Sequence, residues 1–305
     1  MTHASDHILS GVALMIGFCV VAPLIDISAK LASAEIPVGQ ITAARFLVQA
    51  AIMAPVVAWM GLAFRVGPGA LGLSLLRAVF LVLSTFAFIS AVAVMPVADA
   101  LAIAFVEPFI LLLLGWAWFG EVVGPRRIIA AGVGFSGALL VIQPSLALFG
   151  TVALYPLGTA LFFAFYMLVT RVLSRRVHPV AMQFHTAWLG FAICLPVLVL
   201  ADGSGIAMLD PVLPQGRFWG FLAGVGLAAT VSHMAITYAL KFAPSSTLAP
   251  LHYLEIVSAV FFGYVIFGDF PASMTWAGIA VIAASGLYVI HRERIMARKI
   301  RVPMN

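Results

Sequence analysis

Charged residues are scarce in this sequence, and that scarcity excludes an ordinary water-soluble globular protein. Lys, Arg, Asp and Glu together make up 9% of the 305 residues, whereas hydrophobic residues make up 64%. A soluble protein of this length needs more charged surface than this. Several apolar runs extend over about 20 residues, the length that an α-helix needs to cross roughly 30 Å of hydrocarbon. The composition therefore predicts an integral membrane protein.

Cysteines and catalytic motifs are scarce as well. The two cysteines, Cys19 and Cys194, lie inside apolar runs and are expected to be free thiols. The sequence contains no Walker A, GxSxG or HExxH pattern, so it offers no motif for ATP hydrolysis, serine hydrolysis or zinc proteolysis. We expect no metal and no cofactor. The first apolar run is too long for a signal peptide and lacks a cleavage site, so we expect a retained helix.

Ten apolar segments can be counted, and short connections containing Pro or Gly separate most of them. They cover residues 8–32, 38–60, 71–94, 97–118, 127–143, 152–173, 180–200, 217–240, 246–267 and 273–291. Only the connection 201–216 is long enough to form a loop with a shape of its own. The pattern predicts an all-α integral membrane protein with ten transmembrane helices.

Basic residues are distributed unevenly between the two predicted sides. With the N-terminus inside, twelve of the sixteen fall on the inner side, while Lys30 and Arg217 fall on the outer side. Cytoplasmic loops carry the excess of Lys and Arg, so both termini are expected in the cytoplasm. Residues 292–305 then form a basic cytoplasmic tail beside anionic headgroups. The net charge of +5 thus reflects membrane orientation, not nucleic-acid binding.

One stretch of the chain occurs twice. Residues 96–121 recur as residues 244–269, and a shift of 148 places Glu107 on Glu255 and Phe119-Gly120-Glu121 on Phe267-Gly268-Asp269. Each copy has a carboxylate near the middle of an apolar segment, where ionisable residues are costly and usually functional.

The repeat divides the chain into residues 8–143 and residues 152–291, with five segments in each half. Lys30 and Arg171 also correspond, at a shift of 141. An odd number of segments per half makes the second half cross the membrane in the opposite sense. Such inverted repeats are typical of alternating-access transporters.

The motifs within these repeats resemble those of a known family. Residues 75–144 are similar to the first EamA module of the drug/metabolite transporter superfamily, and residues 235–269 to the second. Arg77, Pro-x-Ala-Asp-Ala at 96–100, Glu107-Pro108 and Gly120-Glu121 carry the match. The resemblance implies ten helices, cytoplasmic termini and a cavity lined mainly by the third, fourth, eighth and ninth helices. It is greatest to the bacterial group that contains S-adenosylmethionine and riboflavin uptake proteins.

These features favour a secondary transporter that moves a small organic metabolite across the bacterial inner membrane without ATP. A vitamin-like or nucleoside-like compound, such as riboflavin or S-adenosylmethionine, is the first expectation. Export of amino acids or related metabolites is the alternative, because related members of the superfamily are exporters. An intramembrane enzyme is a distant third possibility. Proton coupling stays open, as do a monomer and a homodimer in the bilayer.

Glu107 is the first candidate for substrate binding. It lies in the middle of its segment, and Pro108 removes a backbone donor beside it. A carboxylate here could bind a cationic group, a hydrogen-bond donor or a proton, or it could hold a kinked helix in place. Phe105, nearby, is also expected beside the cavity.

A second group of candidates lies in the other half. His252 and Glu255 share a helical face at a spacing of three residues, and such a pair could exchange a proton near neutral pH. With no third ligand nearby in the sequence, a metal site is not expected. His233 and Tyr238 could add to this polar patch, and Tyr253 is expected beside the cavity.

Four charged residues lie within or at the ends of the first three segments: Asp26, Lys30, Arg45 and Arg77. Asp26 and Lys30 share a helical face, so an ion-pair cluster with Arg45 at the outer mouth is expected. A gate, or an arginine that clamps a substrate carboxylate, is the alternative. Arg77 is expected to be structural and to extend toward the cytoplasmic side, in the direction of Glu121.

Overall fold

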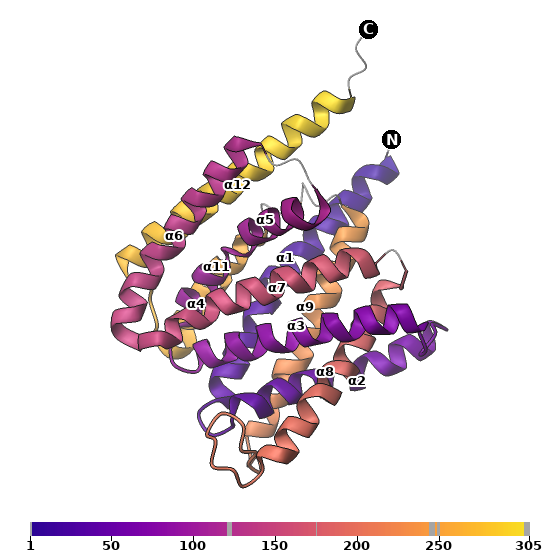
Figure 1. The fold of residues 1–305 in the computed structure, drawn as a ribbon, viewed down its shortest axis with the longest axis vertical. Helices are drawn as coiled ribbons and strands as arrows, with labels where there is room; N and C mark the ends of the chain where they lie inside the picture. Colours follow the sequence, from indigo (N-terminus) through magenta and orange to yellow (C-terminus); the bar gives the residue numbers. More distant parts are fainter. Residues whose placement is uncertain (1, 121–123, 175, 244–247, 249–250, 302–305) are drawn as a thin grey trace.

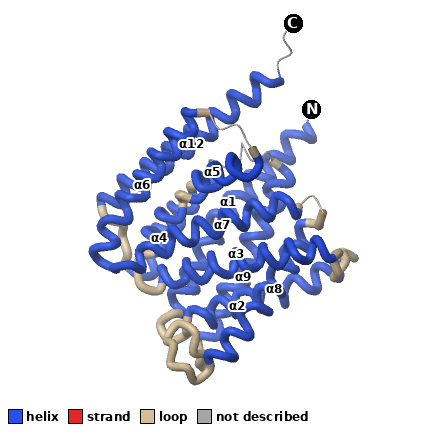
Figure 2. Tube along the Cα trace, in the orientation of Figure 1, coloured by secondary structure: helices blue, strands red, loops and turns tan. Residues whose placement is uncertain are grey.

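The computed structural model describes residues 2–120, 124–174, 176–243, 248 and 251–301. Its helices in the first half are α1 (Thr2–Ala32), α2 (Val38–Trp59), α3 (Pro68–Val92), α4 (Val97–Ala104), α5 (Glu107–Phe119) and α6 (Pro125–Phe149). After the 3-10 turn η1 (Gly150–Leu154), the second half contains α7 (Tyr155–Leu173), α8 (Pro179–Ala201), α9 (Phe218–Phe242), α11 (Leu254–Phe267) and α12 (Ser273–Arg301). The described part of the chain contains no β-strand, as Figure 2 shows.

Seven helical stretches in the described residues are long and apolar enough to cross a membrane. One of these, Ile128–Leu173, has 46 residues and contains both α6 and α7, while Leu254–Phe267 and Ser273–Tyr288 are shorter apolar helices. The membrane-spanning character expected from composition is therefore confirmed. The segment 97–118, expected as a single helix, is instead two helices, because α4 ends at Ala104 and α5 begins at Glu107. Pro144 lies inside α6, so the expected break there is wrong, and the chain turns at Gly150.

The two halves pack between each other and do not form separate bundles. α1 of the first half packs along α9 of the second half, and the equivalent pair, α7 of the second half and α3 of the first half, also packs together (Figure 1). Each of α2 and α6 packs against its own counterpart, α8 and α12 respectively. If each helix is replaced by its counterpart in the other half, the same set of main helix contacts is obtained. The start of α1 and the end of α12 lie at the same end of the molecule.

The interior of the bundle contains polar side chains, and the exterior is mainly apolar. Arg45, Arg77 and Glu255 are 4%, 1% and 7% exposed, whereas Trp59, Trp118 and many aliphatic side chains face outward. This distribution suits a protein whose surroundings are hydrocarbon.

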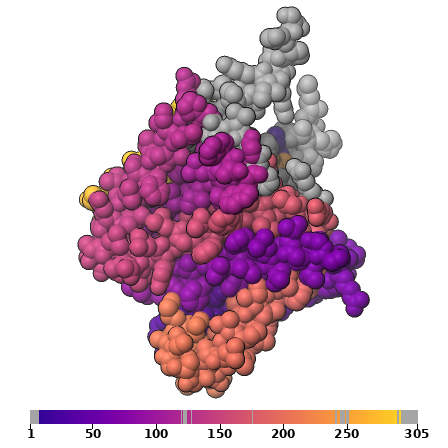
Figure 3. Space-filling model, in the orientation of Figure 1, coloured from indigo at the N-terminus to yellow at the C-terminus, as the bar shows by residue number. Residues whose placement is uncertain are grey.

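The connection after α8 is the longest loop between helices. Its residues form part of the surface at the lower end of the molecule in Figure 3. Asp210 accepts hydrogen bonds from the backbone N–H groups of Gly203 and Gly205, at 2.9 Å each, and Gln40 bonds the backbone of Val212. The loop is therefore attached to the start of α2 and has a defined shape, as the sequence indicated.

Candidate functional site

The two copies of the repeated stretch are interrupted at the same place. In the first copy, Phe105 and Val106 form a turn between α4 and α5. In the second copy, Tyr253 forms a turn between the helical residues 251–252 and α11. The C-terminal ends of α5 and α11 also correspond, because Gly120 and Gly268 terminate these helices with φ values of 63° and 74°. Helices interrupted within the membrane expose backbone groups and are typical of substrate sites in transporters.

The two interruptions meet near the centre of the protein. The rings of Phe105 and Tyr253, which correspond in the repeat, stack with their centroids 5.4 Å apart. The His252 ring lies edge-on to both Phe105 and Phe18, at 5.3 Å from each. Phe18 of α1, Phe105 of the α4–α5 turn, and His252 and Tyr253 just before α11 therefore form one aromatic cluster.

Close packing fixes the Tyr253 side of this cluster. A Cβ atom on Gly286 of α12 would collide with the Tyr253 hydroxyl, so only glycine leaves room for the ring. The Cys19 thiol on α1 donates a hydrogen bond to the Leu251 carbonyl at 3.2 Å. Cys19 and Gly286 are neighbours of the site that the sequence did not single out. Ser285-Gly286 repeats Ser136-Gly137, and that correspondence was the available signal.

The two repeated carboxylates have different partners. Glu255 is bonded to His252, with 2.9 Å between Oε2 and Nε2. Glu107 stands in the first turn of α5, and its Oε1 is buried without a hydrogen-bond partner among the described residues. Both His252 and Tyr253 lie within electrostatic range of Glu107. One carboxylate is thus bound within the protein, and the other has an oxygen available.

His233 and Tyr238 both contact residues of α2. The His233 Nε2 is 3.1 Å from Nη2 of Arg45, whose Nη1 bonds the hydroxyl of Thr85. Tyr238 packs near Met53 and Val57 of α2. His233 therefore belongs to an arginine cluster formed by α2, α3 and α9.

Arg77 is held in the interior by neutral groups. Its Nε donates to Thr170 at 2.7 Å, and its Nη atoms donate to the hydroxyls of Thr186 and Tyr166 and to the Met182 carbonyl at 3.3 Å. Its guanidinium also lies 4.3 Å from the Tyr166 ring centroid. Arg77 therefore joins α3 to α7 and α8. The expected partner, Glu121, lies outside the described residues.

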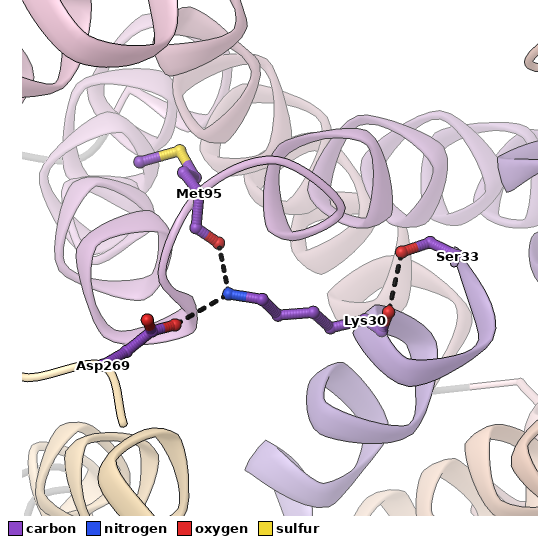
Figure 4. A network of polar contacts seen from close by, with 4 residues as sticks. All are labelled: Lys30, Ser33, Met95 and Asp269. Carbon is purple, nitrogen blue, oxygen red and sulfur yellow. Dashed lines mark hydrogen bonds and ion pairs between the residues drawn. The ribbon is translucent and has the colours of Figure 1, made fainter. Parts of the chain in front are cut away.

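Lys30 has a different partner from the one expected. Its ammonium is 2.8 Å from Asp269 Oδ2 and donates to the Met95 carbonyl at 3.1 Å (Figure 4). These contacts join the end of α1 to the α3–α4 and α11–α12 connections. Among the described residues Asp26 forms no ion pair with Lys30 or Arg45, so the pairings expected for Asp26 are wrong.

A recess adjoins this ion pair. It has a volume of about 320 Å³ and is lined by Lys30, Leu31, Ser33, Ala34, Ala93, Arg217, Phe221 and Phe267. The Lys30 ammonium also lies 4.7 Å from the Phe267 ring centroid. No group of three potential metal ligands was found in the described residues.

Comparison with known proteins gives a family match over both halves. The model of the EamA-like transporter family matches residues 9–143 and 150–291. A riboflavin transporter of Rhizobium johnstonii is 29% identical over 74% of this chain and 72% of its own. An S-adenosylmethionine uptake transporter of Rickettsia felis is 24% identical over 74% of each chain.

An exporter is similar over a longer stretch. A pseudopaline exporter of Pseudomonas aeruginosa is 26% identical over 92% of this chain and 95% of its own. One solved crystal structure has a TM-score of 0.63 at 17% identity, covering 95% of this chain and 99% of that one, and it supports the fold alone.

Proposed function

Because the chain belongs to the EamA-like transporter family, we propose that it is a secondary transporter that moves a small organic metabolite across the bacterial inner membrane. Movement occurs by alternating access and without ATP. The observation that carries this proposal is the meeting of two equivalent helix interruptions, each followed by a glutamate, at the contact between the halves. Interrupted helices at a repeat interface are where secondary transporters bind their substrates.

The proposed architecture has ten spans, with five in each of two inverted repeats. In this scheme α4 with α5, and α11 with the residues before it, each form one interrupted span. Residues 8–143 and 152–291 are the two repeats, and the basic segment 292–305 is a cytoplasmic tail. The exchange of helix contacts between halves supports this scheme, as does the location of the start of α1 and the end of α12 at the same end of the molecule.

The proposed binding site is the centre of this interface. Glu107 supplies an available carboxylate oxygen, and Phe105, Tyr253 and His252 supply aromatic surfaces for a planar or hydrophobic part of the substrate. Glu255 positions His252, and this pair could also exchange a proton with the substrate pathway. We propose that this site binds a substrate and does not catalyse a reaction.

The names of the relatives suggest the first substrates to test. Uptake of riboflavin or S-adenosylmethionine, or of compounds like them, is the leading candidate. Export of an amino-acid-like metabolite is the second candidate, and similarity to the pseudopaline exporter favours it. An alternating-access carrier moves its substrate down whichever gradient exists, so both directions use the same site.

Lys30 and Asp269 form the proposed outer gate. Their ion pair joins elements of both halves beside the outer recess, and it must open if the halves separate there. Lys30→Asp and Asp269→Lys should each lower transport, and the double exchange should partly restore it. Full transport by both single variants would remove Lys30 and Asp269 from the gate.

Counterflow in liposomes tests the carrier proposal. Liposomes containing the purified protein are loaded with unlabelled riboflavin, S-adenosylmethionine or mixed amino acids, and diluted into the labelled compound. A carrier accumulates label transiently without ATP, whereas protein-free liposomes do not. If no compound of this panel accumulates, the proposed function is wrong for these substrate classes.

A further inference from the structure

Arg45 and Arg77 are both buried in the described part of the chain, and the guanidinium of Arg45 has fewer hydrogen bonds than that of Arg77. Its side chain lies on α2, the residue is 4% exposed, and the guanidinium is 4.9 Å from the Phe46 ring centroid. Nη1 donates to Thr85 and Nη2 contacts His233, but Nε is buried without a hydrogen-bond partner among the described residues. A buried donor without a partner is costly, so its retention calls for an explanation.

Arg77 shows that this interior can supply an acceptor to every nitrogen of a guanidinium. Every nitrogen of Arg77 donates to a neutral acceptor on α7 or α8. Hydroxyl and carbonyl acceptors for a buried guanidinium are therefore present in this interior. Nevertheless, none of them bonds the Nε of Arg45 among the described residues. An acceptor that is absent from the bare protein would complete its coordination.

Among the residues that the structure describes, no carboxylate is bonded to Arg45 as a counter-ion. Asp26 on α1 is the described carboxylate within electrostatic range, but the two side chains are not within ion-pairing distance. Asp26 lies within range of Glu255 as well. Because the charge of a buried arginine is stabilised best by a directly bonded anion, Asp26 provides only partial compensation.

We propose that Arg45 binds an oxyanion of the transported molecule, either a carboxylate or a phosphate. Nε and the neighbouring Nη form the side-on pair of donors that matches two oxygens of such a group. Thr85 and His233 hold the guanidinium in place, and Asp26 compensates its charge only in part when no substrate is bound. This inference rests on the proposed function and narrows the substrate class.

Two pairs of probe compounds test the inference because the members of each pair differ in one oxyanion. S-adenosylmethionine is compared with its decarboxylated analogue, and flavin mononucleotide with riboflavin. Affinities are obtained from the rise in melting temperature of the purified protein with ligand concentration. In at least one pair, the member with the oxyanion should bind at least about tenfold more tightly, as expected for a charge-assisted hydrogen-bonded pair.

Variants assign the preference to Arg45. Arg45→Gln should abolish the preference, and Arg45→Lys should keep part of it because it retains the charge but not the paired donors. Arg65→Gln, in an exposed loop, is the matched control and should keep the full preference.

Equal affinities within both pairs, including no binding by any of the four compounds, would overturn the inference. A preference that survives in Arg45→Gln would do so as well. If riboflavin shows counterflow but the affinities within each pair are equal, the carrier function stands and the role of Arg45 is wrong. An oxyanion preference that depends on Arg45, without counterflow of any compound, would mean that the role of Arg45 in binding stands and the carrier function is wrong.

Discussion

Glu107 and Glu255 occupy equivalent positions in the two repeats but differ in what surrounds them. Glu255 is 7% exposed and is bonded to His252, which lies three residues earlier, just before α11. Glu107 has no corresponding histidine, because the residue three positions before it is Ala104, and its Oε1 has no partner among the described residues. The repeat has kept the carboxylate in both halves and kept the internal partner in only one.

This difference indicates a division of labour between the halves. A paired carboxylate stabilises the local structure, whereas an unpaired one at the centre of a membrane protein is available to a ligand. We therefore assign Glu255 to positioning of the His252 ring and Glu107 to contact with the substrate.

The largest effect on stability is expected from separating His252 and Glu255. Glu255→Ala should lower the free energy of unfolding by roughly 3 kcal/mol, because it removes the hydrogen bond between a buried carboxylate and the partly exposed His252 ring. His252→Phe keeps the ring between Phe18 and Phe105 while removing the hydrogen bond. A double-mutant cycle measured by denaturant unfolding should give a coupling of about 1.5–3 kcal/mol. Additive effects would show that the pair contributes nothing.

A smaller effect is expected at Gly286. Gly286→Ala places a methyl group against the Tyr253 hydroxyl, so the ring must leave its stack with Phe105. We expect a loss of about 1–3 kcal/mol, as for other overpacked sites, together with weaker substrate binding. Gly17→Ala on α1, where no atom lies within 4 Å, is the control and should be neutral or slightly stabilising. Equal stability of the two variants would contradict the packing of Tyr253.

Substitution of Glu107 should affect stability less than substitution of Glu255. Glu107→Gln keeps shape and polarity without the charge, so the unfolding free energy should stay within about 0.5 kcal/mol of the wild type. Glu107→Ala should lose about 1 kcal/mol because it leaves unfilled space. Melting temperatures in the same detergent give the comparison. A strongly destabilised Gln variant would assign Glu107 to the scaffold, and substrate binding to the His252 side.

The smallest effect is expected from Pro108. The second half is interrupted at the equivalent point with Ile256 in place of this proline, so the proline is not required for the interruption. Pro108→Ile should therefore retain transport and change stability by about 0.5 kcal/mol or less. A loss of transport comparable with that of Glu107→Gln would show that the two interruptions arise differently.

Much of the fold can be read from the sequence because hydrocarbon imposes simple demands. Apolar length predicts helices, and the shift of 148 relates the two halves before any coordinates are known. The interruption after Ala104 is harder to predict, since Val97–Trp118 has the mean hydropathy of a continuous membrane span and Pro108 marks only one of the two copies.

The partners of the charged residues could not be predicted from the sequence. Lys30 bonds Asp269, 239 residues away, and Arg45 contacts His233, 188 residues away. Lipid and protein interior are both apolar, so the hydrophobic pattern of a helix does not say which face meets which neighbour. Asp26 therefore looked like the natural partner of Lys30, four residues on, although helix packing brings Asp269 closer. Gly268-Asp269 repeating Gly120-Glu121 was the one sequence sign that Asp269 mattered.

Counterflow by Glu107→Gln and Glu255→Gln, measured side by side in liposomes with equal amounts of folded protein, tests the division of labour most directly. The substrate is whichever panel compound the wild-type protein accumulates. We predict that Glu107→Gln transports at least about tenfold more slowly than Glu255→Gln, because it removes a charge that contacts the substrate. Equal rates, or a slower Glu255→Gln variant, would contradict the account.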